Sequence, residues 1–226
     1  MQQPINEFVL GKVLLINKPL QWTSFDAVRK IRNLIKIPKV GHAGTLDPLA
    51  SGLLIICTGK FTKKINEYMG MEKEYTGTIT LGATTPSFDL ETQPENFKDT
   101  SFLNEEKLQT TTQQFIGNIL QMPPQFSAIK KDGKRLYESA RKGIEVKVEP
   151  RPINISVFEL TKIEMPVVYF RVVCSTGTYI RSLANDFGAV LGVGGYLSSL
   201  CRTRIGSFKL ENATSIEVFE AALKNK

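Results

Sequence analysis

The chain has 226 residues, and its 29 lysines and arginines outnumber its 22 aspartates and glutamates, giving a formal charge of +7 at neutral pH. A pI near 9.3 favours a polyanionic partner such as nucleic acid, although an ordinary basic protein has the same balance. A single histidine excludes a histidine-rich metal site, and three widely spaced cysteines speak against zinc. No GxxxxGK[ST] or GxGxxG motif is present, so we expect neither cofactor nor metal, although a metal held by carboxylates alone stays open.

The start of the chain and its cysteines bear on its location. The first residues lack the basic segment and long apolar core of a signal peptide, and no apolar run approaches the length of a membrane span. Cys57, Cys174 and Cys201 are an odd number of cysteines in apolar or mixed surroundings, which is typical of reduced structural thiols. We therefore expect a cytoplasmic protein without membrane attachment.

Hydrophobic periodicity predicts a series of strands and helices, beginning with a buried strand at 12–17 and a helix that Ser24 caps. The apolar residues at helical spacing in this helix are Phe25, Val28, Ile31 and Ile35. The later elements are a strand at 53–58, a short helix at 61–69, a strand at 73–83, helices at 104–116 and 178–190, a strand at 166–175, a strand pair or turn around LCRTRIGSF and a helix at 215–224. Because these elements alternate irregularly, we expect an α+β fold on a mixed, largely antiparallel sheet flanked by helices.

The segment 121–151 is more basic than the rest of the chain. It holds eight lysines or arginines and four acidic residues, and Phe126 and Tyr137 are interleaved among them. Basic residues mixed with aromatic ones are typical of an arm that lies on the phosphates of a nucleic acid. The same composition fits a solvated helical hairpin, so composition alone leaves both interpretations open.

The stretch GHAGTLDPLASGLL at 41–54 contains the only histidine of the chain, His42, and one acidic residue, Asp47. Pro48 moves the backbone of Asp47 away from helical geometry, and the surrounding glycines allow tight turns and the close approach of a ligand. An aspartate presented in this way could be a nucleophile, a general base or the cap of a turn. His42 by itself could equally be a packed, hydrogen-bonded side chain.

This loop is one of several motifs that follow each other in order along nearly the whole chain. GHAGTLDP with a downstream GTYIR is a specific combination, and with it the chain resembles the TruB family of tRNA pseudouridine synthases. The other stretches that carry the resemblance are NKP at 17–19, KEYTGTITLG at 73–82, TTPSFD at 84–89, PPQFSAIKKDGKRLYESARKG at 123–143, CSTGTYIRSLANDFG at 174–188 and LCRTRIGSF at 200–208. The resemblance implies the pseudouridine synthase fold with an inserted RNA-binding arm at about 121–151.

The resemblance implies an isomerase that converts uridine to pseudouridine in the T loop of tRNA, at position 55, without cofactor or metal. The uracil is detached from the ribose at N1, rotated and rejoined through C5, after the nucleotide is flipped into a pocket. Asp47 matches the catalytic aspartate, which either attacks ribose C1′ or removes a ribose proton on a glycal route, and the sequence leaves both open. Arg181 matches the arginine that pairs with this aspartate, and Tyr75 matches a tyrosine that can stack on the uracil.

The same resemblance assigns further residues. Tyr179 and Leu200 match residues that line the uracil pocket, and His42 matches a histidine that enters the RNA loop where the flipped base was. Asp89 matches a polar residue of the active-site cleft, and Lys18 of the NKP motif matches a residue that supports the floor of the site. The candidates for phosphate contact in the arm are Lys130, Lys131, Lys134, Arg135, Arg141 and Lys142.

Two departures from the family pattern concern RNA binding. Many bacterial members continue into a small C-terminal PUA domain, whereas this chain stops about 18 residues after RIGSF. We therefore expect a short form, with a single catalytic domain over 1–226 and no PUA domain, and weaker contacts to the acceptor stem. Cys201 stands where a basic residue is expected after Leu200, which removes one phosphate contact.

The expected partner is the T stem-loop of tRNA, bound by a stand-alone monomer that needs no obligatory protein partner. A second possibility is a tRNA-binding folding chaperone whose catalysis is secondary or lost, and a third is an unrelated basic α+β domain. The set of Asp47, Tyr75 and Arg181 argues against the chaperone, because binding alone needs no carboxylate beside an anionic RNA.

Overall fold

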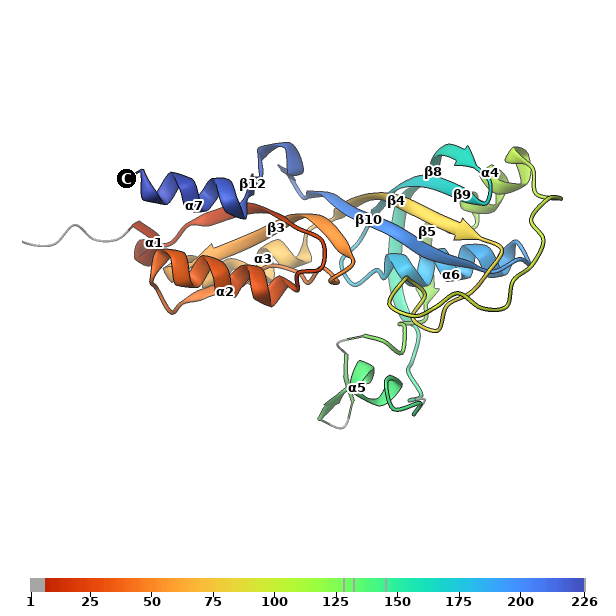
Figure 1. Ribbon diagram of the computed structural model, residues 1–226, viewed down its shortest axis with the longest axis horizontal. Helices are drawn as coiled ribbons and strands as arrows, with labels where there is room; N and C mark the ends of the chain where they lie inside the picture. The colour runs from red at the N-terminus through yellow and green to blue at the C-terminus, as the bar shows by residue number, and fades with distance from the viewer. Residues whose placement is uncertain (1–6, 128, 132, 145, 226) are drawn as a thin grey trace, which may run out of the picture. The chain divides into compact units, whose positions relative to one another are not determined.

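The chain divides into two compact units in a computed structural model that describes residues 7–127, 129–131, 133–144 and 146–225 (Figure 1). The first unit comprises Met1–Thr76 with Leu200–Lys226, and the second comprises Gly77–Ser199. The chain passes from one unit to the other within two strands, β4 (Lys73–Leu81) and β10 (Gly195–Ile205). The prediction of one catalytic domain over 1–226 covers both units together and stays a prediction.

The strands of the first unit follow the order β12–β1–β3–β10. The remaining bounds are β1 (Val13–Lys18), β2 (Val40–His42), β3 (Ala50–Thr58), β11 (Phe208–Lys209) and β12 (Thr214–Ser215). β3 runs antiparallel to β1 and β2 but parallel to β10, and β1 runs parallel to β12. The sheet is therefore mixed, as the sequence predicts.

Helices complete the first unit. They are α1 (Glu7–Leu10), α2 (Ser24–Ile35), α3 (Ile65–Gly70) and α7 (Ile216–Lys224), with 3₁₀ helices η1 (Gly59–Lys64) and η2 (Leu210–Asn212). Val28, Ile31 and Ile35 of α2 pack into one apolar cluster with strand residues such as Ile16, as their spacing predicts. Phe25 was predicted on the same apolar face, but 57 % of its surface is exposed.

The N-terminus of α2 corrects one prediction, because its N-cap is Thr23 and not Ser24. The Thr23 hydroxyl accepts a hydrogen bond from the Asp26 amide, and the Asp26 carboxylate accepts one from the Thr23 amide, both at 3.0 Å. The Ser24 hydroxyl is buried instead and bonds both main-chain groups of Leu46. Either residue type can cap a helix, so the contact with Leu46 decided which one does.

Replacing Thr23 by alanine is expected to lower the free energy of unfolding by about 1 kcal/mol, because a first-turn amide of α2 loses its acceptor. Urea denaturation followed by circular dichroism measures this loss. Thr110→Ala is the matched control, since Thr110 is exposed within α4 (Glu105–Gln113). Equal losses in both variants would show that the cap contributes nothing.

The second unit is built on strands in the order β10–β4–β9–β8–β5. β5 (Gly117–Gln121), β8 (Arg151–Glu164) and β9 (Val167–Cys174) pair antiparallel. The helix α6 (Ile180–Val190) and α4 complete this unit. Its core holds four phenylalanines in edge-to-face contacts, which are Phe115, Phe158, Phe170 and Phe187.

The basic arm lies within the second unit and contains a small hairpin and a short helix. These are β6 (Lys130–Lys131), β7 (Lys134–Arg135) and α5 (Leu136–Ala140). Both ends of the arm are tied together, because the side chain of Gln125 bonds the main-chain amide and carbonyl of Val146. In the part of the chain that the structure describes, no helix is both long and apolar enough to span a bilayer.

Candidate active site

Asp47 lies in the loop between β2 and β3, and main-chain contacts fix this loop on both sides of it. Before Asp47, the Ala43 amide donates to the Ile55 carbonyl at 2.9 Å. After it, the carbonyl of Asp47 accepts from the Ala50 amide at 3.0 Å, and the carbonyl of Pro48 accepts from the Gln21 amide at 2.7 Å. The Asp47 side chain is half-buried, so a ligand can approach a carboxylate whose backbone is held in place.

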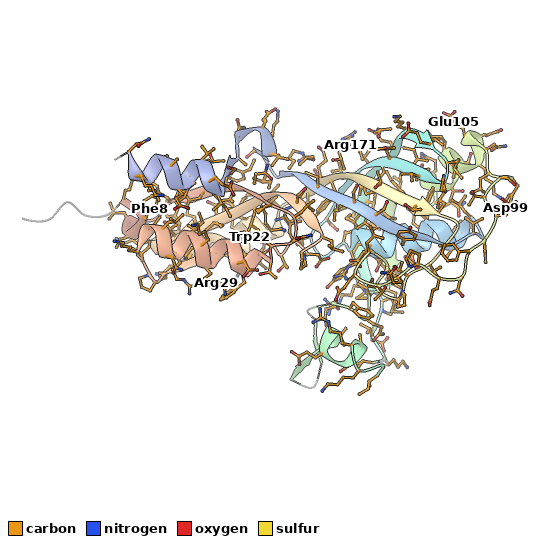
Figure 2. The ribbon with its side chains drawn as sticks, viewed as in Figure 1. Phe8, Trp22, Arg29, Asp99, Glu105 and Arg171 are labelled. Atoms are coloured by element: carbon orange, nitrogen blue, oxygen red, sulfur yellow. The ribbon has the colours of Figure 1, made fainter. Side chains whose placement is uncertain are left out.

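Two cations with almost no exposed surface lie in the same unit as this loop. Lys18 has no exposed surface and Arg202 has 1 %. The Lys18 ammonium donates to the carbonyls of Pro19, at 2.9 Å, and of Trp22, at 2.6 Å, and Trp22 lies just before α2 (Figure 2). Burial lowers the pKa of Lys18 to about 8, and the charge of Arg202 adds to this effect while Asp47 opposes it. Lys18 therefore holds the turn beside the loop.

The lowered pKa of Lys18 predicts a stability that depends on pH. Between about pH 8 and 10.5 the unfolded chain holds the Lys18 proton and the folded chain releases it. The free energy of unfolding therefore increases with pH in this range, by at most about 1.4 kcal/mol per pH unit. Below pH 8 both states hold the proton and the contribution is constant. Urea denaturation at pH 7, 8, 9 and 10 measures this rise.

Lys18→Met is the reference for that experiment, because the difference between wild type and variant cancels the titration of other groups. We expect the stability of wild type relative to Lys18→Met to increase from pH 8 to pH 10. A difference that stays constant over this range would contradict the lowered pKa.

His42, Tyr75 and Leu200 belong to the same unit as Asp47. His42 ends β2 opposite Ile56, and Leu200 lies in β10 opposite Ala50 of β3. Burial first, and then the charge of Arg202, lower the pKa of His42, while a hydrogen bond with the Gly44 backbone works against them. At neutral pH the imidazole is therefore mainly uncharged and can act as a hydrogen-bonding or stacking group. Tyr75 lies on the buried face of β4 with 8 % of its surface exposed.

Arg181 and Asp89 form a buried ion pair in the second unit. Nη1 of Arg181 lies 3.7 Å from Oδ2 of Asp89, and their side chains are only 5 % and 8 % exposed. The other carboxylate oxygen of Asp89 accepts a hydrogen bond from the Glu91 amide at 2.9 Å. Phe88, directly before Asp89, has a φ of +65°, a strained value for a bulky residue. Such strain at the residue beside a buried carboxylate is typical of a functional loop.

Tyr179 immediately precedes α6, and Gln121 at the end of β5 holds its main chain. The Gln121 amide donates to the Tyr179 carbonyl at 3.0 Å, and its oxygen accepts from the Tyr179 amide at 2.8 Å. The Ser182 hydroxyl donates to the carbonyl of Met122, so two neighbouring residues of the chain fix the start of α6. Gln121 was not predicted as a site residue, because its only signal is a polar residue at the end of a strand.

The arm residues are only partly described. The backbones of Lys130, Lys131, Lys134 and Arg135 form β6 and β7, but their side chains lie outside the described part of the chain. Arg141 is exposed and forms an ion pair with Glu91 at 2.7 Å, whereas Lys142 is exposed beside it. Exposed cations of this kind are able to contact phosphate groups, and Glu91 partly neutralises the charge of one of them, Arg141.

The described candidates divide between the two units. The first contains Lys18, His42, Asp47, Tyr75 and Leu200, and the second contains Asp89, Tyr179 and Arg181. Each set is ordered by hydrogen bonds, pairing or burial within its own unit. Over the described ranges, no group of three or more histidine, cysteine, aspartate or glutamate side chains could hold a metal ion.

The family model and the curated relatives that match this chain all belong to one family. Residues 32–180 match the family model of the TruB family pseudouridylate synthase, N-terminal domain. A tRNA pseudouridine synthase B of Flavobacterium johnsoniae is 55 % identical over 96 % of this chain and 98 % of its own length. The protein of the same name from Phocaeicola vulgatus is 50 % identical over 94 % of this chain and 93 % of its own length.

Solved structures give the same result for the fold. A Cbf5–Nop10–Gar1 complex contains a chain that is 31 % identical, with a TM-score of 0.76 over 97 % of this chain. An H/ACA RNP bound to a substrate RNA containing 2′-deoxyuridine gives 28 % identity and a TM-score of 0.73, also over 97 % of this chain. This chain spans 56 % of the length of each matched chain.

Proposed function

This chain belongs to the TruB family of pseudouridylate synthases, and on that basis we propose that it converts a uridine of tRNA to pseudouridine. The observation that carries the proposal is the 55 % identity to a tRNA pseudouridine synthase B over 98 % of that protein's length. The motif resemblance narrows the substrate to the uridine at position 55, in the T loop.

The proposed reaction is an isomerisation whose atoms balance without a co-reactant. The bond from N1 of uracil to C1′ of the ribose breaks and a bond from C5 to C1′ forms, while C5 loses its proton to water and N1 takes up a proton from water. A uracil that is stacked in the T loop is inaccessible, so the nucleotide must be flipped out before reaction. Recognition then rests on the shape of the RNA loop and on the exposed base, as is usual for RNA.

Asp47 is the proposed catalytic carboxylate, acting either as a nucleophile at C1′ or as the base of a glycal route. A half-buried carboxylate on a loop that is bonded on both sides supports this role. Arg181 is proposed to orient and stabilise the carboxylate during reaction, and Tyr75 to stack on the uracil and accompany the proton transfer at C5. The ion pair with Asp89 supports the role of Arg181, because it holds the guanidinium in one place.

The remaining candidates are proposed to bind substrate. Leu200 and Tyr179 line the uracil pocket, and the uncharged His42 occupies the position that the flipped base leaves. The arm binds the tRNA backbone, with Lys142 as its clearest described cation. Lys18 is proposed to support the floor of the site by positioning the Pro19–Trp22 turn, a role that its full burial and its two carbonyl bonds support.

We further propose a cytoplasmic monomer without an obligatory protein partner. The tRNA substrate supports the location, together with three cysteines that form no disulfide in the described part of the chain. Size-exclusion chromatography with light scattering, with and without tRNA, tests the monomer. A stable dimer in the absence of tRNA would contradict it.

The function is tested by incubating the purified protein with an unmodified tRNA transcript and mapping pseudouridine by chemical labelling and primer extension. We expect conversion at the T-loop uridine alone, and none in a transcript that carries cytidine at that position. Tight binding of tRNA without conversion would overturn the proposal and leave the chaperone function. Conversion at several unrelated uridines would contradict the proposed specificity.

A further inference from the structure

Arg202 is the largest fully buried side chain in the described part of the chain, and the mechanism above gives it no task. It lies in β10, two residues after Leu200, and its main chain pairs with Gly52 of β3. Within the described ranges its guanidinium bonds only main-chain carbonyls and no carboxylate. Burying a cation is unfavourable unless its donors are satisfied, so the partners of these donors indicate what the residue does.

The three partners join β3 to the loop that carries Asp47. Nε of Arg202 donates to the carbonyl of Leu53 in β3 at 2.8 Å. Nη2 donates to the carbonyl of Gly44 at 3.2 Å, and Nη1 donates to that of Thr45 at 3.4 Å. One planar group therefore reaches the strand after the loop and two consecutive residues just before Asp47.

These two contacts complete the attachment of the loop. Ala43 is held by β3 and Leu46 by the Ser24 hydroxyl, whereas Gly44 and Thr45 between them are held through Arg202. Gly44 has a φ of +92°, which favours glycine, so its carbonyl is presented from an unusual turn. Without the guanidinium, the carbonyls of Gly44 and Thr45 would lose this donor and this part of the loop could rearrange.

The backbone around Arg202 is itself held tightly. Gly52 has a φ of +104°, and a Cβ on it would lie 2.4 Å from the Arg202 carbonyl oxygen, so β3 and β10 approach more closely here than other residues allow. This close approach fixes the starting point of the arginine side chain relative to β3. The guanidinium therefore holds the loop in a fixed position relative to the sheet.

We propose that Arg202 is a positioning residue for the pseudouridine synthase reaction, which sets the place of the Asp47 carboxylate through the carbonyls of Gly44 and Thr45. This inference rests on the proposed function. A displacement of about 1 Å in a reacting group can reduce a rate by about 10²-fold. We therefore expect replacement of Arg202 to lower kcat and to leave RNA binding nearly unchanged. Lysine cannot replace it fully, because a single ammonium does not present the planar fork of donors that spans three carbonyls.

The test compares Arg202→Met and Arg202→Lys with wild type in single-turnover conversion of the tRNA transcript, with tRNA Kd and Tm measured on the same samples. We expect kcat to fall about 10²-fold in Arg202→Met and less in Arg202→Lys, while Kd changes less than about twofold. Ile205→Ala is the matched control, because Ile205 is a fully buried residue of the same strand without a bond to the loop. It should lower Tm with little change in kcat.

A second variant keeps the test decisive if Arg202→Met does not fold. Ser24→Ala removes the neighbouring attachment at Leu46 and should lower kcat about tenfold without changing Kd. The inference is overturned if the Arg202 variants lose activity only in proportion to their Tm, as Ile205→Ala does, or only through Kd. Failure of wild type to convert tRNA would overturn the proposed function instead, so the two failures are distinguishable.

Discussion

Replacing Asp47 by asparagine is expected to reduce the rate of pseudouridine formation by about 10⁴-fold, because either proposed role of this residue requires an ionised carboxylate. Asparagine has nearly the same shape, and the main-chain bonds of the loop do not involve the replaced atoms. Binding of tRNA should therefore remain within about threefold of wild type, on the order of a rim contact. Single-turnover mapping of pseudouridine and a filter-binding assay measure the two quantities.

Asp99→Asn is the matched control for this experiment. Asp99 is an exposed aspartate in a loop of the second unit (Figure 2), and its carboxylate accepts hydrogen bonds from the amide and the hydroxyl of Ser101. Its replacement should leave the rate unchanged. If Asp47→Asn keeps a wild-type rate, a different carboxylate performs the reaction and the proposed site is wrong.

The second large effect is expected at the buried ion pair of Arg181 and Asp89. Arg181→Met should lower kcat by about 10²- to 10³-fold, which is the usual cost of losing a group that stabilises charge in a transition state. Asp89→Asn should lower the free energy of unfolding by about 3 kcal/mol, because a buried cation loses an attraction that water cannot replace. Single-turnover kinetics and urea denaturation measure these effects.

Arg171→Met provides the contrast for both variants. Arg171 pairs with Glu159 at 2.7 Å, but the two side chains are 35 % and 48 % exposed, so the pair should contribute no more than about 1 kcal/mol. A double-mutant cycle of Asp47 and Arg181 then measures whether these residues act together in the reaction. Strictly additive losses would contradict the proposed coupling.

The elements that the sequence predicted well are those with an uninterrupted pattern. β4 was predicted as a strand at 73–83, and it alternates regularly, with Tyr75, Ile79 and Leu81 all buried. β8 was missed for a physical reason, although it is long. A register shift between Ile155 and Val157 moves the buried face from odd to even positions, so no single alternation runs through the strand.

The candidate site shows the same division between local and non-local information. Asp47 was singled out because its loop carries the GHAGTLDP motif of the resemblance, which is local sequence information. Arg202 lies within the LCRTRIGSF motif at 200–208. Its proposed positioning role depends on the pairing of β10 with β3, which no sequence pattern near Arg202 indicates. The contact of Asp89 with Arg181 joins residues far apart in the chain and was invisible for the same reason. Local patterns thus indicate which residues react, and tertiary contacts decide what holds them.

Release of tritium from C5 tests the claim that this protein isomerises one uridine of tRNA. A transcript labelled at C5 of its uridines is incubated with the protein, because only formation of the bond from C5 to C1′ expels that hydrogen to water. We predict that release reaches a plateau at one tritium per tRNA and that Asp47→Asn releases none. A tRNA that binds with high affinity and yet retains all its tritium would contradict the claim.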